Sequence, residues 1–343
     1  MTLSYRTRKR LRGLGIGLMI LLLVAAVVLL CWLLWLDRFI IYSRDGAQLN
    51  FDLSPEFSPG VAATEPTAGE TVSIYYNEGD AAVDTGTELT QLAGYYVDTE
   101  TLKEGVAPIR SQLEQLPAGT AVLIDLKNPF GAFYYSSDVG NASSEVDIAA
   151  MDELISYLRS SNLYTIARVP ALRDRQFGLD NVPAGLFLPS GIGLWPDDQG
   201  CYWLNPTHGS TQTYLIQIAT ELRGLGFDEV VFSEFRFPDT SNAVFDGDRA
   251  QALASTAETL VDSCATETFA VSFAVRDASF TLPEGRCRMY LENAAAADVK
   301  NLAEQTGLTD PQIRLVFLTE ANDTRYDDYG VLRPISSFYS GEE

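Results

Sequence analysis

The chain has 343 residues, 46% of them hydrophobic, and a formal net charge of −22 at pH 7. Residues 45–343 carry 17 basic and 45 acidic side chains, a net charge of −28. Because such a surface repels phosphate backbones, the composition argues against nucleic acid as a partner. The chain holds one histidine and four cysteines in no ligand spacing, so we expect no metal site, and no motif predicts a cofactor.

An uncharged, apolar segment over residues 15–36 predicts a transmembrane helix, because 22 residues can cross a hydrocarbon core of about 30 Å. Five basic residues precede it: Arg6, Arg8, Lys9, Arg10 and Arg12. The positive-inside rule places residues 1–14 in the cytoplasm and the remainder outside. A cleaved signal peptide is the alternative, but its apolar core is shorter and ends in a small-x-small site, which is missing here. We expect a single-pass signal anchor in the cell membrane, with an extracellular domain.

Residues 37–88 are predicted to form an acidic linker rich in proline and glycine. No basic residue occurs between Arg44 and Lys103. Such a composition favours an extended chain, with a short strand at 72–76.

From residue 89 to 343, strand-like and helix-like segments alternate. We predict strands over 93–97, 121–126, 164–169, 230–235, 269–275, 288–291 and 313–318. Helices are predicted over 102–116, 146–160, 212–225, 248–263 and 294–305. This alternation and length are typical of an α/β fold, a (β/α)8 TIM-like barrel. The eighth strand falls in 330–335, or the barrel is open; a doubly wound sheet is disfavoured because no Gly-x-Gly-x-x-Gly follows an early strand.

The cysteines outside the membrane segment can form a disulfide, since an extracellular compartment permits one. Cys264 ends a predicted helix and Cys287 opens a predicted strand, both on the amino-terminal face of the barrel. We therefore predict this pair as the bridge.

Residues 224–238 contain a buried strand whose charged residues stand at its carboxyl end, where TIM barrels bind ligands. The stretch resembles the signature of a family of bacterial envelope proteins described as putative glycoside hydrolases, with a TIM-barrel domain related to α-amylases. The matching positions are Gly226, Phe227, Asp228, Glu229, Phe232, Arg236, Phe237 and Pro238.

Further motifs of the family occur in its order, so the resemblance covers residues 94–238. They are Leu-Ile-Asp-Leu-Lys-Asn at 123–128, Ile-Ala-Arg-Val at 166–169 and Trp-Leu-Asn-Pro at 203–206. Three acidic positions of the family are replaced, by Asn128, Ser233 and Ala274, and Glu234 stands where the family has a tyrosine.

The resemblance implies hydrolysis of a glycosidic bond by two carboxyl groups, about 5–5.5 Å apart for retention or about 6.5–9.5 Å for inversion. Asp125 is the first candidate, and its alternative role is an ion pair with Lys127 or Arg168. Glu234 is the second candidate, although strand alternation turns it away from Ser233 unless a bulge intervenes. Its alternative role is an ion pair two residues along the chain, with Arg236.

Glu292 also ends a strand and is the third catalytic candidate. The candidates for substrate binding are Tyr96, Lys127, Arg168, Trp195, Trp203 and Arg236. The two tryptophans lie on a long excursion over 171–211, and long loops in compact domains are usually functional. Aromatic rings suit the apolar faces of sugars in a mostly apolar cleft.

These expectations combine into a membrane-anchored protein that hydrolyses or binds a cell-envelope or extracellular polysaccharide. The alternative is a catalytically inactive pseudoenzyme, a glycan-binding or scaffolding module, which the replaced acidic positions favour. A third hypothesis is a partner-binding ectodomain, which a large apolar surface patch without a cleft would support.

Overall fold

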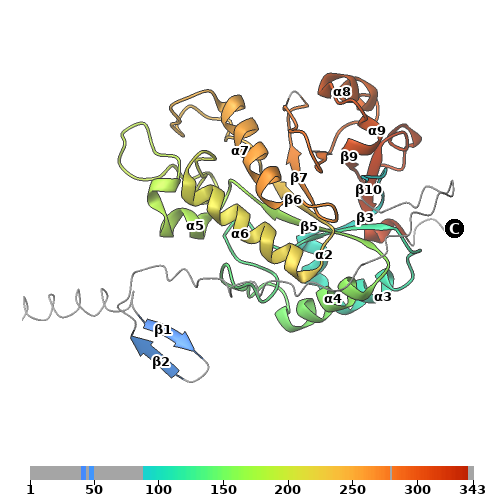
Figure 1. Ribbon diagram of the computed structural model, residues 1–343, viewed down its shortest axis with the longest axis horizontal. Coiled ribbons are helices and arrows are strands. Elements are labelled where there is room, and N and C mark those ends of the chain that lie inside the picture. The colour runs from blue at the N-terminus through green and yellow to red at the C-terminus, as the bar shows by residue number, and fades with distance from the viewer. Residues whose placement is uncertain (1–39, 44–45, 50–87, 279, 339–343) are drawn as a thin grey trace, which may run out of the picture. The chain divides into compact units, whose positions relative to one another are not determined.

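The computed structural model describes residues 40–43, 46–49, 88–278 and 280–338 (Figure 1). In the first of two compact units, β1 (Ile40–Ser43) pairs antiparallel with β2 (Gly46–Leu49). The predicted transmembrane segment, 15–36, and most of the predicted linker lie outside the described residues. Among the helices that are described, none combines the length and apolar character needed to cross a membrane.

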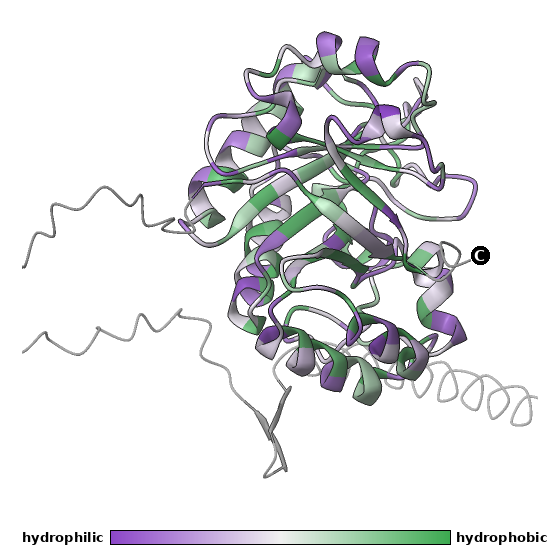
Figure 2. Ribbon diagram, turned by 90° about the vertical axis from the view of Figure 1, so that its right-hand side faces the viewer, coloured by the Kyte–Doolittle hydropathy of each residue, from purple (hydrophilic) through white to green (hydrophobic). Residues whose placement is uncertain are grey.

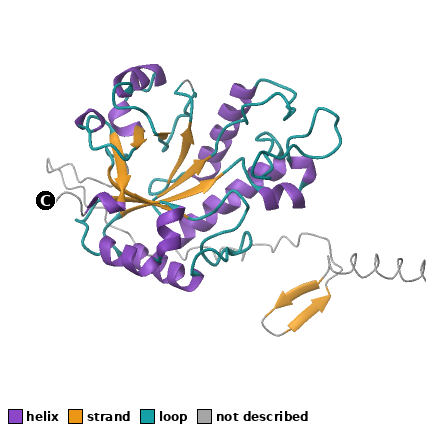
Figure 3. Cartoon of the chain, turned by 180° about the vertical axis from the view of Figure 1, so that it is seen from behind, coloured by secondary structure: helices purple, strands orange, loops and turns teal. Residues whose placement is uncertain are grey.

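Eight parallel strands form a closed barrel in the second unit (Figure 3). They are β3 (Ala93–Val97), β4 (Ala121–Asp125), β5 (Tyr164–Pro170), β6 (Glu229–Ser233), β7 (Ala270–Val275), β8 (Met289–Glu292), β9 (Leu315–Leu318) and β10 (Gly330–Pro334). Each strand pairs with the next, and β10 pairs with both β9 and β3. The predicted TIM-like barrel is therefore confirmed, and β10 occupies the segment expected for the eighth strand.

Helices follow most strands and lie outside the barrel (Figure 1). They are α2 (Thr99–Glu104), α3 (Val106–Leu113), α4 (Ile148–Ser160), α5 (Arg175–Asp180), α6 (Gly209–Leu225), α7 (Arg249–Cys264), α8 (Val299–Thr306) and α9 (Pro311–Arg314), with 3-10 turns η2 (Val182–Ala184), η3 (Thr324–Tyr326) and η4 (Ile335–Phe338). The helix predicted over 102–116 is divided at Gly105. Its φ of 135° is far from helical values, and glycine adopts it readily because glycine has no Cβ.

Strand alternation sorts the apolar side chains into two layers, and Figure 2 shows the hydrophobic character of the strands. One cluster fills the barrel interior and includes Leu123, Ile166, Val231, Tyr290 and Val316. The residues between them point outward and pack against the helices in a second cluster, which includes Val122, Ala167, Val230, Phe232 and Phe273. Because successive side chains alternate, Asp125, Arg168 and Ser233 continue the interior rows at the carboxyl ends of their strands.

A buried ion pair lies at the amino-terminal end of the barrel interior. Arg288 Nη1 donates to Glu229 Oε2 at 2.5 Å, and both side chains are 1% exposed or less. The hydroxyls of Tyr164 and Tyr290 also donate to Glu229, each at 2.9 Å, and Arg288 donates to the Thr90 carbonyl. Such a pair is tolerated in a core because every charged oxygen has a donor.

The predicted disulfide between Cys264 and Cys287 is wrong. Both thiols are free and buried, as is that of Cys201. Cys264 ends α7 within the outer core cluster, and the Cys287 thiol donates to the Pro283 carbonyl oxygen at 3.2 Å. Cys264 thus packs as a small apolar side chain, and Cys287 is held by weak polar contacts to Pro283 and Arg314.

A reductant is accordingly expected to leave the melting temperature of the full-length protein unchanged. Losing a native disulfide from a small secreted domain costs about 2–5 kcal/mol, so a bridge would produce a clear downward shift. Differential scanning calorimetry with and without dithiothreitol checks this. A fall in melting temperature on reduction that is absent from a Cys264→Ser variant would show that Cys264 forms a disulfide.

Candidate active site

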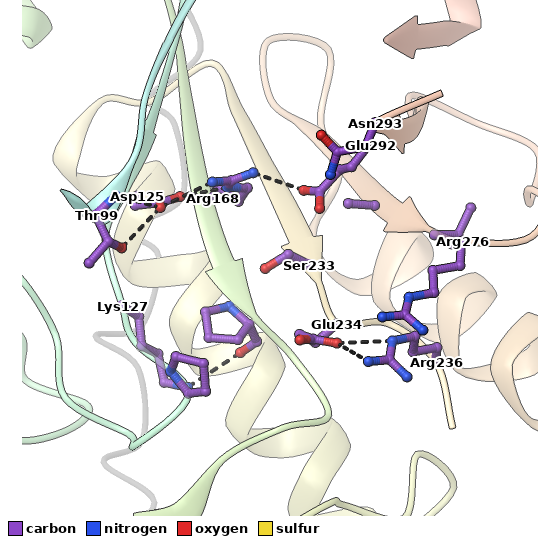
Figure 4. Close-up of a pocket in the computed structure, with 14 residues that line it drawn as sticks. Thr99, Asp125, Lys127, Arg168, Ser233, Glu234, Arg236, Arg276, Glu292 and Asn293 are labelled. Carbon is purple, nitrogen blue, oxygen red and sulfur yellow. Dashed lines mark hydrogen bonds and ion pairs between the residues drawn. The ribbon is translucent and has the colours of Figure 1, made fainter. Parts of the chain in front are cut away.

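A pocket of about 370 Å³ opens at the carboxyl ends of the strands (Figure 4). Its lining is polar and comes from six of the eight strand ends and the loops that follow: Thr99, Asp125, Lys127, Pro129, Arg168, Pro170, Ser233, Glu234, Arg236, Ala274, Val275, Arg276, Glu292 and Asn293. Ligands bind at this face of TIM barrels. The structure thus brings together all three predicted catalytic carboxylates.

Arg168 lies between Asp125 and Glu292 and bonds both (Figure 4). Its Nε and Nη2 donate to the two Asp125 oxygens at 2.5 and 3.0 Å, and its Nη1 donates to Glu292 Oε1 at 2.8 Å. The pairing follows from the register, because Asp125 on β4 is opposite Arg168 on β5. The predicted ion-pair partner of Asp125 is therefore Arg168 rather than Lys127.

Thr99 completes the contacts of Asp125. Its backbone N–H and its hydroxyl both donate to Asp125 Oδ2, at 2.9 and 3.0 Å. Asp125 thus accepts four hydrogen bonds, and a carboxylate offers about four lone-pair sites. Burial alone would lower the pKa of Arg168, but the charges of Asp125 and Glu292 raise it above its ordinary value. The guanidinium therefore remains charged between its two partners.

Glu234 lines the same pocket as its neighbour Ser233, which a regular strand does not allow. The strand β6 ends at Ser233, and Glu234 has a φ of 49°, in the left-handed region. The other non-glycine residue with positive φ among the described residues is Asn293, at 57°, which follows Glu292 at the end of β8. Non-glycine residues in this region cost about 1–3 kcal/mol and concentrate at functional sites.

Glu234 belongs to an ion-pair network at the wall of the pocket. Arg236 Nε donates to Glu234 Oε2 at 3.0 Å, and Arg236 Nη2 lies 2.9 Å from the same oxygen. The opposite oxygen of Glu234 lies 3.8 Å from Arg173 Nη1. The ion pair between Glu234 and Arg236, one of the two roles expected from the sequence, is thus present.

Lys127 lines the pocket with its stem, but its ammonium is directed into the protein. The Lys127 Nζ lies 2.6 Å from Asp174 Oδ2, with both side chains fully buried, and donates to the Pro170 carbonyl at 3.3 Å. Asp174 also accepts from the Tyr214 hydroxyl at 2.9 Å. The structure therefore gives the Lys127 ammonium protein partners, although the sequence suggested a substrate contact.

The predicted aromatic contacts lie in different places. Tyr96 is half-buried on the interior side of β3, and burial, followed by the charges of Glu320 and Asp98, raises its pKa to about 12. Trp195 and Trp203 line a second pocket, on the excursion after β5. Neither lines the central pocket.

Sequence reasoning missed several residues of the central pocket, including Thr99, Arg276 and Asn293. Each directly follows the end of a strand or comes one residue later, so the strand-end rule that selected Asp125 would have selected them. Within the described part of the chain, no group of three histidine, cysteine or acidic side chains is placed to hold a metal ion.

Solved structures give three comparisons. The glycoside hydrolase domain of PelA from Pseudomonas aeruginosa is 14% identical, with a TM-score of 0.46 over 72% of this chain and 96% of that domain. A hypothetical protein from Ruminiclostridium thermocellum is 20% identical, with a TM-score of 0.45 over 52% of this chain and 96% of that one. A GH20 exo-β-N-acetylglucosaminidase from Vibrio harveyi is 11% identical, with a TM-score of 0.46 over 74% of this chain. The match spans 46% of that enzyme's length.

A search of curated proteins finds no match. A family model described as a putative glycosyl hydrolase domain matches residues 111–272, which contain the motifs around Asp125, Arg168, Trp203 and Ser233. The family resemblance inferred from the sequence motifs is therefore confirmed over residues 111–272, where this chain is similar to the putative glycosyl hydrolase domain.

Proposed function

We propose that the barrel binds a polysaccharide at its central pocket without hydrolysing it. One observation carries this proposal: each of the three carboxylates in the pocket is bonded to a guanidinium group. Asp125 and Glu292 share Arg168, and Glu234 is paired with Arg236. In glycosidases the sugar bond lies between two carboxyl groups, whereas here Arg168 occupies the space between Asp125 and Glu292.

The remaining chemistry of the pocket supports binding over hydrolysis. Both oxygens of Asp125 are held by protein donors, Oδ1 by Arg168 and Oδ2 by Arg168 and Thr99. The position at which the family keeps an aspartate carries the Ser233 hydroxyl. Within the described residues, the Ser233 hydroxyl is hydrogen-bonded to none of the pocket carboxylates, and no histidine lines the pocket, so Ser233 is not paired with a base that would activate it.

The pocket still offers hydrogen-bonding groups to sugar hydroxyls. Within the described residues, the side chains of Ser233 and Asn293 bond to no other residue, and both face the pocket. Glu292 is 40% exposed, and Arg168 keeps N–H groups beyond the three that it uses. Fixed polar groups of this kind orient a bound sugar.

The net charge of −22 at pH 7 indicates which polysaccharides the protein can approach. A strongly acidic protein repels polyanions at long range. We therefore propose a neutral or amino-bearing polymer of the cell envelope or the extracellular matrix as the ligand, and disfavour polymers rich in uronic acid or phosphate.

Anchoring at the cell surface is part of the proposal. The apolar segment 15–36 and the basic residues before it support a membrane anchor with the barrel outside. Treating intact cells with a protease checks the orientation, because an external barrel is degraded while a cytoplasmic one is protected.

A Ser233→Trp variant is expected to lower glycan affinity by about 10-fold or more, the equivalent of 1.4 kcal/mol, because an indole would fill the centre of the pocket. Affinity electrophoresis of the full-length protein in mild detergent measures this, with gels that contain laminarin, cellulose derivatives, chitosan or polygalacturonate. Ser156→Trp, at an exposed position on α4, is the matched control and should bind like the wild type. If a glycan gel slows the wild type and Ser233→Trp equally, the glycan binds outside this pocket.

A further inference from the structure

The central pocket continues into a second pocket of about 380 Å³. The two share Glu234, Arg236 and Arg276 as lining residues. The second pocket lies against the excursion that follows β5 and is also lined by Trp195 and Trp203. A ligand that extends from the barrel centre toward this excursion therefore passes over the Glu234–Arg236 pair.

This shared wall is held by a ring of contacts. Arg236 lies over the Trp203 ring, with its guanidinium carbon 4.6 Å from the ring centroid. The Trp203 indole N–H donates to Asp197 at 3.2 Å, and Arg173 donates to the same carboxylate at 2.6 Å. Because Trp203 is 3% exposed and carries Arg236 on its ring, it supports the wall and has no face left for a sugar.

Trp195 is the aromatic side chain that remains available in the second pocket. It is half-buried and packs against a small cluster that includes Leu186 and Phe237. Its backbone N–H donates to the Leu186 carbonyl at 2.9 Å, and this bond holds the Trp195 backbone in place. A partly exposed ring on a fixed backbone is suited to stacking on an apolar sugar face.

Polar groups stand beside this ring. Asp198 is exposed and, within the described residues, has no hydrogen-bond or ion-pair partner. Gln199 accepts a bond from Arg173 at 2.7 Å through its oxygen, so its amide N–H groups remain available. The second pocket thus combines an aromatic platform with free acceptor and donor groups, as a sugar site requires.

We infer that the two pockets form one groove that binds consecutive units of a glycan chain, with the Trp195 ring as the platform for the outer unit. This inference rests on the proposed glycan-binding function. It assigns the ligand as an internal stretch or end of a polymer at least two sugars long, and it predicts that single sugars bind weakly. It also makes Trp195, rather than Trp203, the residue that sets the preference for longer chains.

The test measures affinity against chain length. Laminari-, cello- and chito-oligosaccharides of one to six units are titrated calorimetrically into the full-length protein in detergent. We expect the affinity of the wild type for its preferred series to rise about 10-fold or more from one unit to the longer members. Trp195→Ala should flatten this rise, and Trp195→Phe, which keeps a ring, should preserve most of it.

The outcomes separate the two proposals. A flat length dependence in the wild type, or the same rise in Trp195→Ala, would overturn the two-site groove while glycan binding itself still stands. If no oligosaccharide and no polysaccharide of the gel panel binds, the proposed function and this inference are both overturned. Matching thermal unfolding of Trp195→Ala and the wild type shows that the variant folds.

Discussion

Replacing Arg288 by methionine is expected to lower the free energy of unfolding by about 3–5 kcal/mol. The substitution leaves Glu229 charged in the barrel interior, where its carboxylate is 0% exposed. The hydroxyls of Tyr164 and Tyr290 would still donate to it, but neutral donors do not balance a buried charge. Denaturant unfolding of the full-length protein in detergent, followed by tryptophan fluorescence, measures the loss.

A double variant gives the control for this result. Arg288→Met combined with Glu229→Leu removes both charges, and apolar replacements of a buried pair are often neutral or stabilising. We expect the double variant to recover much of the stability lost by Arg288→Met alone. If Arg288→Met alone lowers the free energy of unfolding by less than about 1 kcal/mol, which is the range of exposed ion pairs, water reaches this end of the barrel.

Replacing Lys127 by methionine is expected to cost a similar amount, about 3–5 kcal/mol. Lys127 neutralises Asp174, whose side chain is fully buried and caps α5 by accepting from the Phe177 N–H at 2.8 Å. The lost charge would leave the Asp174 carboxylate with neutral donors alone, among them the Tyr214 hydroxyl. The same unfolding measurement detects the loss.

The Lys127 variant also separates a structural role from a ligand contact. With Asp174→Asn added, the uncompensated charge disappears, and stability should recover in part. If Lys127→Met instead unfolded like the wild type but lost glycan affinity, its ammonium would be a ligand contact, contrary to the geometry.

The barrel could be predicted because its signals are local. Apolar segments of four to seven residues alternate with amphipathic ones, and this pattern alone specifies parallel strands with covering helices. The closing strand β10 was harder to place, because its segment, Gly330–Pro334, is followed only by the short turn η4. The break of the first helix at Gly105 depends on a single backbone angle, which periodicity does not encode.

The members of the site were predictable, but their partners were not. Asp125 and Glu292 end strands and Glu234 directly follows one, and the carboxyl ends of parallel strands meet at one face of a barrel. The choice of Arg168 as a bridge depends on register and on a contact to Glu292 across 124 residues of sequence. Alternation predicted that Glu234 faces away from Ser233, and the positive φ at Glu234 overrides that pattern.

The prediction of a disulfide between Cys264 and Cys287 also failed because it depends on three-dimensional geometry. Location on one face of the barrel brings Cys264 and Cys287 into one core cluster, but a disulfide also demands that the two side chains approach in a narrow geometry. Sequence position does not specify that approach. Both thiols are instead free and buried.

The most direct test of the central claim is product analysis on a polysaccharide that the protein binds. The full-length protein is incubated with the polymer that retards it in affinity gels, and reducing ends are quantified over a long time course. We predict saturable binding with no release of reducing ends above a protein-free control. Release that disappears in Asp125→Asn or Glu292→Gln would contradict the account and establish the pocket as a hydrolytic site.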